Sequence, residues 1–241
     1  MQAEAELGLG NYNRSIAFGE SSLSLLDAEP YSIETIVDVA GTSFEVIQVL
    51  LSAYSAIENK SKTLSVIEKA KGLSNFKYGG DDGFRLIKDF KIFPILAQAY
   101  FTLGDHQESL KYSTLVIKNA ESLGYFETVF YSAMTTINST VTNEKTADDE
   151  VQRFADTMFA NRLQSRVIKA RSELELGKYN EAKAGFDEVL SSKLITGITS
   201  MYYPVLHDRG RVAEALGDNE SAEQFYQESI DVIENSRSSL K

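Results

Sequence analysis

Four segments of the chain share one pattern, in which a Leu-Gly pair is followed by a polar residue and then by a small residue. The Gly positions are Gly10, Gly104, Gly177 and Gly217, and the small residues five positions later are Ser15, Ser109, Ala182 and Ala222. A degenerate fifth copy has Glu58 in the Gly position and Thr63 in the small position. Recurrence of this kind indicates a repeat architecture, which constrains the fold more than any other feature of the sequence.

The pattern predicts a helix, a tight turn and a second, antiparallel helix. A Gly that ends a helix adopts the left-handed conformation without a Cβ clash, and a following Asn or Asp caps the next helix. Small residues also recur seven positions before the marker, at Ala3, Ala97, Ala170 and Gly210, where paired helices can approach closely. No segment shows sustained strand alternation. We therefore predict an all-α fold with at least nine helices.

The turns near residues 10, 58, 104, 177 and 217 predict one helical-repeat domain over residues 1–241. The long step between the third and fourth turns predicts a divergent repeat near residues 125–165. Turn formers and polar clusters predict loops over residues 27–31, 73–83, 138–149 and 191–200.

Gly10 follows a short first helix and no apolar capping helix follows the last pair, so we expect a fragment of a longer protein. In that case Leu7, Ile16 and Leu23 would lie partly uncovered. A short first helix that a partner covers is the alternative.

The repeat resembles the tetratricopeptide repeat (TPR) family. The matching residues are Ala97, Tyr100, Gly104 and Val116, then Ala170, Gly177, Ala182 and Phe186, then Gly210, Gly217, Ala222 and Tyr226. The resemblance implies an α-solenoid wound into a right-handed superhelix. It also implies a non-enzymatic scaffold whose first helices line a concave, peptide-binding or protein-binding face. Lys169 and Arg209 depart from the family, which has an apolar residue at their position.

A second resemblance lies near the C-terminal end, in residues 217–220, 230–234 and 236–240. These segments look like the last repeat of arrays fused to caspase-like (CHAT) proteases, which implies that the array regulates a fused or partner protease. An array with another downstream domain, or with none, is the alternative. A sensor array that binds a signalling peptide and switches an output domain is the second functional hypothesis.

Composition narrows the function. With 24 Lys and Arg against 35 Asp and Glu, the net charge is −11, which argues against a nucleic-acid partner. The absence of Cys excludes a thiolate metal site and a Cys nucleophile. No stretch is apolar and long enough to cross a membrane, and no secretory signal is visible, so we expect a cytoplasmic protein. We expect no cofactor, no metal and no enzymatic activity, and the oligomeric state stays open.

Residues 78–84 resemble the Gly-Gly-acidic-acidic-Phe hairpin of diguanylate cyclases. However, Gly83 interrupts the order of the two acidic residues and the Phe. We therefore expect a connecting loop over Gly79–Gly83, without cyclase chemistry.

Two basic triplets, residues 169–171 and 209–211, occupy the same register of the last two first helices. The resemblance places Arg171 and Arg211, six residues before their Gly, in the concave groove, and His207 lies one helical turn before Arg211. Stacked guanidinium groups can bind carboxylates through two hydrogen bonds, so these three residues predict a site for an acidic protein segment. Alternatively, both arginines pair with Glu173, Glu175 or Glu214.

Overall fold

The computed structural model describes residues 2–28, 33–74, 82–119, 161–192 and 195–238. It describes the backbone alone for residues 26–28, 33–42, 44, 73–74, 82–91 and 197. Within these ranges the chain is helical, with no strand, and ten α-helical segments exceed the nine expected. The all-α fold class is therefore confirmed.

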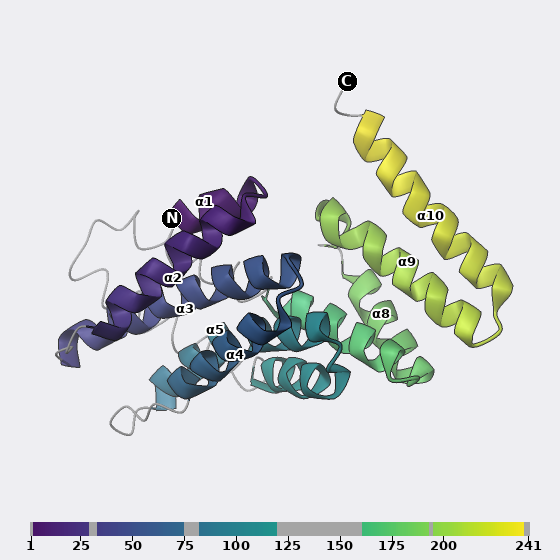
Figure 1. Ribbon diagram of the computed structural model, residues 1–241. Coiled ribbons are helices and arrows are strands. Elements are labelled where there is room, and N and C mark those ends of the chain that lie inside the picture. The colour runs from purple at the N-terminus through teal and green to yellow at the C-terminus, as the bar shows by residue number, and fades with distance from the viewer. Residues whose placement is uncertain (1, 29–32, 75–81, 120–160, 193–194, 239–241) are drawn as a thin grey trace, which may run out of the picture. The chain divides into compact units, whose positions relative to one another are not determined.

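The chain divides into two compact units, Met1–Asp105 and His106–Lys241. The described residues of the first form five helices (Figure 1): α1 (Gln2–Gly8), α2 (Tyr12–Ala28), α3 (Ile33–Ala56), α4 (Lys60–Ser74) and α5 (Asp82–Leu103). The second contains the helical residues 106–119 and 161–175, then α8 (Tyr179–Ser191), the short 3-10 helix η1 (Ile195–Gly197), α9 (Thr199–Ala215) and α10 (Asn219–Ser238). A single domain over residues 1–241 and the superhelix hand stay predictions.

All five predicted turns have the expected backbone. The four Gly residues have φ between 74° and 81°, and Glu58 has φ of 55°. At Gly217 the amide donates to the Glu214 carbonyl at 3.0 Å, and the Asp218 amide donates to the Ala213 carbonyl at 2.9 Å. These paired bonds form the Schellman motif that closes a helix on a left-handed residue. The predicted Gly role is thus confirmed, and Glu58 performs it without being Gly.

The residue after the turn caps the next helix where its side chain allows. Asp218 Oδ1 accepts a hydrogen bond from the Ser221 amide at 3.1 Å, and Asn59 Oδ1 accepts one from the Lys62 amide at 3.2 Å. Lys178 makes no side-chain cap for α8. Side-chain capping is therefore seen at Asn59 and Asp218, two of the Asn and Asp positions that the pattern marks.

In the first unit, successive helices pack against one another from α1 to α5. Ser15 is buried and donates to the Ala3 carbonyl at 2.8 Å, so the small residues allow close approach as predicted. Gly19 lies against Leu50, whose Cδ2 is 2.7 Å from the position of a Cβ at residue 19. Leu23 is buried, so the expectation that it lies partly uncovered was wrong.

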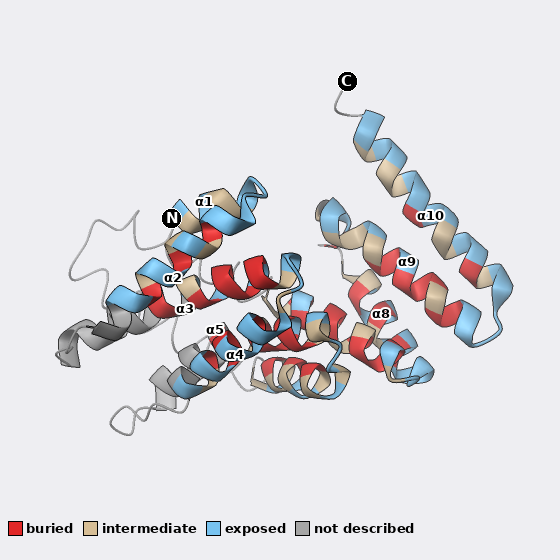
Figure 2. Ribbon diagram, in the orientation of Figure 1, coloured by how far each residue is buried: buried red, intermediate tan, exposed pale blue. Residues whose placement is uncertain are grey.

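In the second unit, a continuous core joins residues 161–175 with α8, η1 and α9. Its members are Leu163, Val167, Ala170, Leu174, Ala182, Phe186, Val189, Ile195, Val205 and Val212. Figure 2 shows α9 buried along one face, whereas α10 is exposed over most of its length. Ala222 and Ser229 are the buried residues of α10.

The helices extend further into the predicted loops than expected. α4 continues to Ser74, and α5 already includes Asp82 and Gly83, so the connecting loop expected over Gly79–Gly83 was wrong at its last two residues. α2 and α9 likewise extend into their neighbouring loops, to Ala28 and from Thr199. The predicted loop over 138–149 and most of the divergent repeat near 125–165 lie outside the described residues.

Candidate functional site

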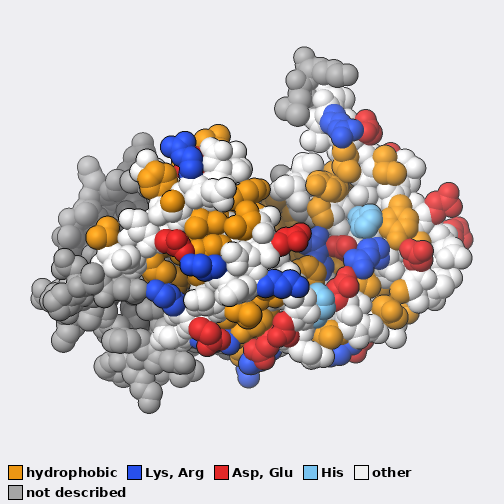
Figure 3. Space-filling model, viewed as in Figure 1, with side chains coloured by type: hydrophobic (Ala, Val, Ile, Leu, Met, Phe, Trp, Pro, Cys, Tyr) orange, Lys and Arg blue, Asp and Glu red, His pale blue; other side chains and the backbone are white. Residues whose placement is uncertain are grey.

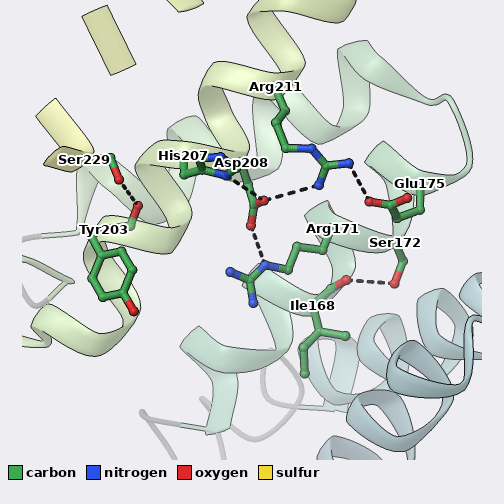
Figure 4. Close-up of polar contacts among 9 residues, drawn as sticks. All are labelled: Ile168, Arg171, Ser172, Glu175, Tyr203, His207, Asp208, Arg211 and Ser229. Atoms are coloured by element: carbon green, nitrogen blue, oxygen red, sulfur yellow. Dashed lines mark hydrogen bonds and ion pairs between the residues drawn. The ribbon is translucent and has the colours of Figure 1, made fainter. Parts of the chain in front are cut away.

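The three residues predicted to bind a partner meet at one carboxylate. Asp208, on α9, is buried, and its Oδ2 accepts a hydrogen bond from Arg171 Nε at 2.6 Å. Its Oδ1 lies 3.5 Å from Arg211 Nη1 and 3.8 Å from His207 Nδ1 (Figure 4). Arg171, Arg211 and His207 are thus brought together as the helical register predicts, and Asp208 is the residue that joins them.

Arg211 is also paired with a second carboxylate. Its Nη2 donates to Glu175 Oε1 at 2.9 Å. Partial burial opposes the charged form, but the hydrogen bond and charge of Glu175, together with Asp208, raise the pKa of Arg211 above its usual value. The alternative pairing predicted with Glu175 therefore occurs at Arg211. The pairing of both arginines with Asp208 was not anticipated.

Arg171 uses only one of its nitrogens in the described part of the chain. Nε bonds Asp208, and Figure 4 shows the two terminal nitrogens pointing away from that carboxylate, with no bonded partner among the residues drawn. The Arg171 side chain is 28% exposed. A planar guanidinium whose Nη edge is open can donate two parallel hydrogen bonds to a carboxylate.

His207 is the most exposed member of the group, with 56% of its side chain accessible. Its ring centroid lies 5.4 Å from that of Tyr226 on α10, at an interplanar angle of 44°. The Tyr226 hydroxyl donates to Glu214 Oε2 at 2.9 Å. Burial, followed by this carboxylate, raises the pKa of Tyr226, so the phenol stays protonated and remains a donor.

A pocket of about 470 Å³ opens beside these residues, between α9, α10 and Arg171. Arg171, His207 and Asp208 form its polar wall, and its apolar wall is formed chiefly by Tyr203, Tyr226, Ile230 and Ile233. The Ser229 hydroxyl donates to the Tyr203 carbonyl at 2.9 Å and ties α10 to α9 here. The pocket therefore places the guanidinium group of Arg171 next to an apolar surface.

The other basic residues of the two triplets point elsewhere. Lys169 Nζ lies 2.5 Å from Glu173 Oε1. Arg209 is buried; its Nε bonds Asp187 Oδ1 at 2.6 Å and its guanidinium lies 4.7 Å from the centre of the Phe225 ring. An ion pair and a ring contact therefore explain how Arg209 occupies a position that is apolar in the family.

Most of the residues that line the pocket are not among those predicted from the sequence. Asp208 lies three residues before Arg211, a spacing that places both on one helical face, so it could have been found. The apolar wall could not, because it depends on how α10 crosses α9. No group of three or more His, Asp or Glu side chains that could hold a metal occurs among the described residues. In the same ranges, we find no helix both long and apolar enough to span a bilayer.

Comparisons with known proteins agree with this architecture. Residues 203–236 match the family model of the tetratricopeptide repeat. A crystal structure of nearly identical TPR-like repeats, assigned to a kinesin light chain of Podosopora anserina, aligns with a TM-score of 0.55. It is 14% identical, and the alignment covers 98% of this chain and 92% of that one.

The crystal structure of BtubC (BKLC) from P. vanneervenii aligns with a TM-score of 0.43 and 15% identity, over 94% of this chain and 92% of that one. No curated protein matches the chain with significant similarity. The turns, the close-contact positions, the family-model match and the kinesin light chain structure lead to one conclusion: residues 203–236 match a tetratricopeptide repeat, in a chain with a TPR-like, all-α helical-repeat fold.

Proposed function

We propose that the protein is a non-enzymatic interaction module that binds an acidic protein or peptide segment at Arg171, with Arg211 and His207 beside it. TPR-like repeats are generally protein-interaction scaffolds. The observation that carries the residue-level proposal is the open Nη edge of Arg171 at the wall of a pocket. The volume of that pocket falls in the range of known ligand sites.

In this proposal the two arginines have different roles, which their contacts support. Arg211 is paired with Glu175 and Asp208. It therefore orients Asp208 and adds positive potential, but it is not the first donor to an incoming carboxylate. Arg171 retains donors for an incoming carboxylate. A side chain next to that carboxylate would contact Tyr203 and Ile233, so the preferred segment combines an acidic residue with a bulky apolar one.

The overall charge of −11 repels an acidic partner, so the attraction must be local. Arg171 lies in a partly buried site, where a hydrogen bond to a charged group is stronger than at a fully solvated surface. This argues for a short-range contact with little long-range steering. Binding should therefore depend on a few side chains and only weakly on the net charge of the partner.

Three further hypotheses come from the sequence, and no contact between described residues supports them. They are regulation of a fused or partner CHAT protease, a signalling-peptide sensor that switches an output domain, and residence in the cytoplasm. The CHAT resemblance lies at the end of the chain. Gly217 is in the turn between α9 and α10, and residues 230–234 are in α10. All three stay hypotheses.

The test is a selection of random 12-residue displayed peptides on the immobilised full chain. We expect enriched peptides to carry Asp or Glu beside a large apolar residue. Titration of a synthetic copy should show at least about tenfold weaker binding to the Arg171→Ala/Arg211→Ala variant, since hydrogen bonds to charged groups are worth roughly 1.5–3 kcal/mol each.

The matched control is Arg237→Ala, which removes an exposed cation whose partner is Glu234 on α10. Binding by this variant should equal that of the unmodified protein. Enrichment of peptides without acidic residues, or unchanged affinity in the double variant, would reject the proposed site.

A further inference from the structure

α10 carries a partly exposed apolar stripe beside its contact with α9. Tyr226, Ile230 and Ile233 follow one another at spacings of four and three residues, which places them on one helical face. Ile230 is 52% exposed, and Tyr203 of α9 is exposed next to it. Contiguous exposed apolar surface that is rimmed by polar residues is typical of an interaction site.

Two hollows make this stripe into a groove. The pocket beside Arg171 and a second hollow of about 320 Å³ share Tyr226 and Ile230. Lining residues run along α10 from Asn219 to Ile233, and at a rise of 1.5 Å per residue this stretch is about 21 Å long. We call it the α10 groove. Its length matches three to four turns of a helix.

The second hollow is acidic. Glu214 and Glu223 line it, and no Lys or Arg is among its described lining residues. On α10 itself there are five carboxylates, at positions 220, 223, 228, 231 and 234, and one cation, Arg237. That cation pairs with Glu234 at 3.1 Å. Figure 3 shows hydrophobic side chains along α10 with acidic side chains beside them.

We propose that the α10 groove docks an amphipathic helix of another protein whose apolar stripe is flanked by Lys or Arg. Apolar residues at i, i+3 or i+4, and i+7 would pack on Tyr226, Ile230 and Ile233, as in other helix-in-groove complexes. The flanking cations would face Glu214 and Glu223. This site shares the apolar wall of the pocket beside Arg171. It goes beyond the proposed function, because it selects a basic helix through Glu214 and Glu223 and does not depend on the open edge of Arg171.

Charge also argues against a second copy of this chain as the occupant. Two α10 grooves placed face to face would bring Glu214 and Glu223 of one chain against the same residues of the other. Like charges across an interface disfavour association, and the net charge of −11 adds to the repulsion. A basic helix would instead be attracted by the same field.

The test uses three synthetic 16-residue peptides of defined design. The first is a helix with a Leu stripe at i, i+4 and i+7 flanked by Lys; the second replaces each Lys by Glu. The third has the composition of the first in an order without an amphipathic face. We expect the full chain to bind the first peptide saturably, with affinity that falls as salt is added, and to bind neither of the others.

Variants locate the binding on the α10 groove. Ile230→Gln should weaken binding of the first peptide at least about tenfold, because central apolar anchors dominate such interfaces. The matched control Leu64→Gln changes a similarly exposed Leu on α4 and should leave binding unchanged. Glu223→Gln should lower the affinity and its salt dependence, whereas Glu228→Gln, on the same helix but outside the hollow, should not.

Equal binding of the first and third peptides, or unchanged affinity in Ile230→Gln, would overturn the inference. Sedimentation of the free chain tests whether a second copy of the chain occupies the α10 groove. A dimer that the Ile230→Gln substitution dissociates would overturn the inference in favour of self-association. Arg171→Ala separates the two sites, because it should weaken binding of the acidic segment and leave binding of the Lys-flanked helix unchanged.

Discussion

Arg171 Nε lies 2.6 Å from Oδ2 of Asp208, which stands 37 positions further along the chain. The same carboxylate lies 3.5 Å from Arg211 Nη1, one turn along its own helix. A single buried carboxylate therefore holds guanidinium groups from two successive first helices. Without it, the two arginines would have one remaining described acidic partner, Glu175, between them.

Asp208→Asn should destabilise the second unit. It keeps the shape of the side chain but removes the charge that two guanidinium groups share, and a charged group left without its partner costs about 1–3 kcal/mol. Urea unfolding should show a lower midpoint. Glu175→Gln is the control, because its contact with Arg211 is more exposed and should change stability by less than about 1 kcal/mol. Equal effects of the two substitutions would contradict the central role of Asp208.

Gly210→Ala should destabilise the last helix pair. A Cβ at residue 210 would lie 2.6 Å from Cε1 of Tyr226, so the ring must move and the α9–α10 packing must loosen. Overpacking of this kind costs about 1–3 kcal/mol. Gly72→Ala is the control: it lies in α4 with nothing within 4 Å of its added Cβ, and it should stabilise by up to about 1 kcal/mol. A melting temperature that shifted in the same direction in both variants would refute this prediction.

Glu58→Gly should stabilise the turn between α3 and α4. Glu58 has φ of 55°, a conformation that costs a residue with a Cβ about 1–2 kcal/mol. Part of the gain is offset by the greater unfolded-state entropy of Gly, so we expect a net increase of about 0.5–1 kcal/mol. The converse substitution, Gly177→Ala at φ of 74°, should lower stability. The denaturant midpoint of unfolding should rise for Glu58→Gly and fall for Gly177→Ala.

Glu20→Gln should reduce the acid sensitivity of the first unit. Hydrogen bonds from Tyr54 and then Lys62 lower the pKa of Glu20 below its usual value of 4.5. A lowered folded-state pKa contributes stability that is fully present above that usual value and is lost as pH falls through the folded one. The melting temperatures of wild type and variant should therefore differ most at neutral pH and converge as the pH falls from 4.5 through the lowered pKa of Glu20.

The control for this pH series is Glu45→Gln, an exposed carboxylate on α3. Its melting temperature should follow that of the wild type at every pH. Parallel curves for wild type and Glu20→Gln would mean that the contacts with Tyr54 and Lys62 carry no pH-linked stability.

Helix-turn-helix architecture was predictable because the turns are local. Left-handed Gly at 10, 104, 177 and 217 needs no distant contact, and the sequence spacing alone places Glu58 in the same role. The small residues Ser15, Ser109, Ala182 and Ala222 were expected at close helix contacts, and all are buried. Helix ends were less predictable, since Asp82 and Gly83 read as turn formers yet begin α5.

The positions of the site residues could be predicted from the repeat register, but which carboxylates pair with them could not. The repeat register and the family resemblance placed Arg171 and Arg211 together, and helical spacing added His207. All three lie at Asp208. The acidic partners were harder to find because Asp208 reaches back across one repeat to Arg171. Nothing local signals which of several nearby carboxylates lies closest. The apolar wall of Tyr203, Ile230 and Ile233 depends on the crossing of α9 and α10, which spacing does not encode.

The paired hydrogen bonds that close each turn also bear on how fast the chain folds. In every case the closing amide reaches a carbonyl only five residues back, as from Asn11 to Glu6 or from Lys178 to Glu173. Folding rates rise as contacts become more local, because little loop entropy is lost before the first contacts form. Each helical hairpin can therefore begin to form by itself, and the slow step is expected to be the docking of one hairpin on the next.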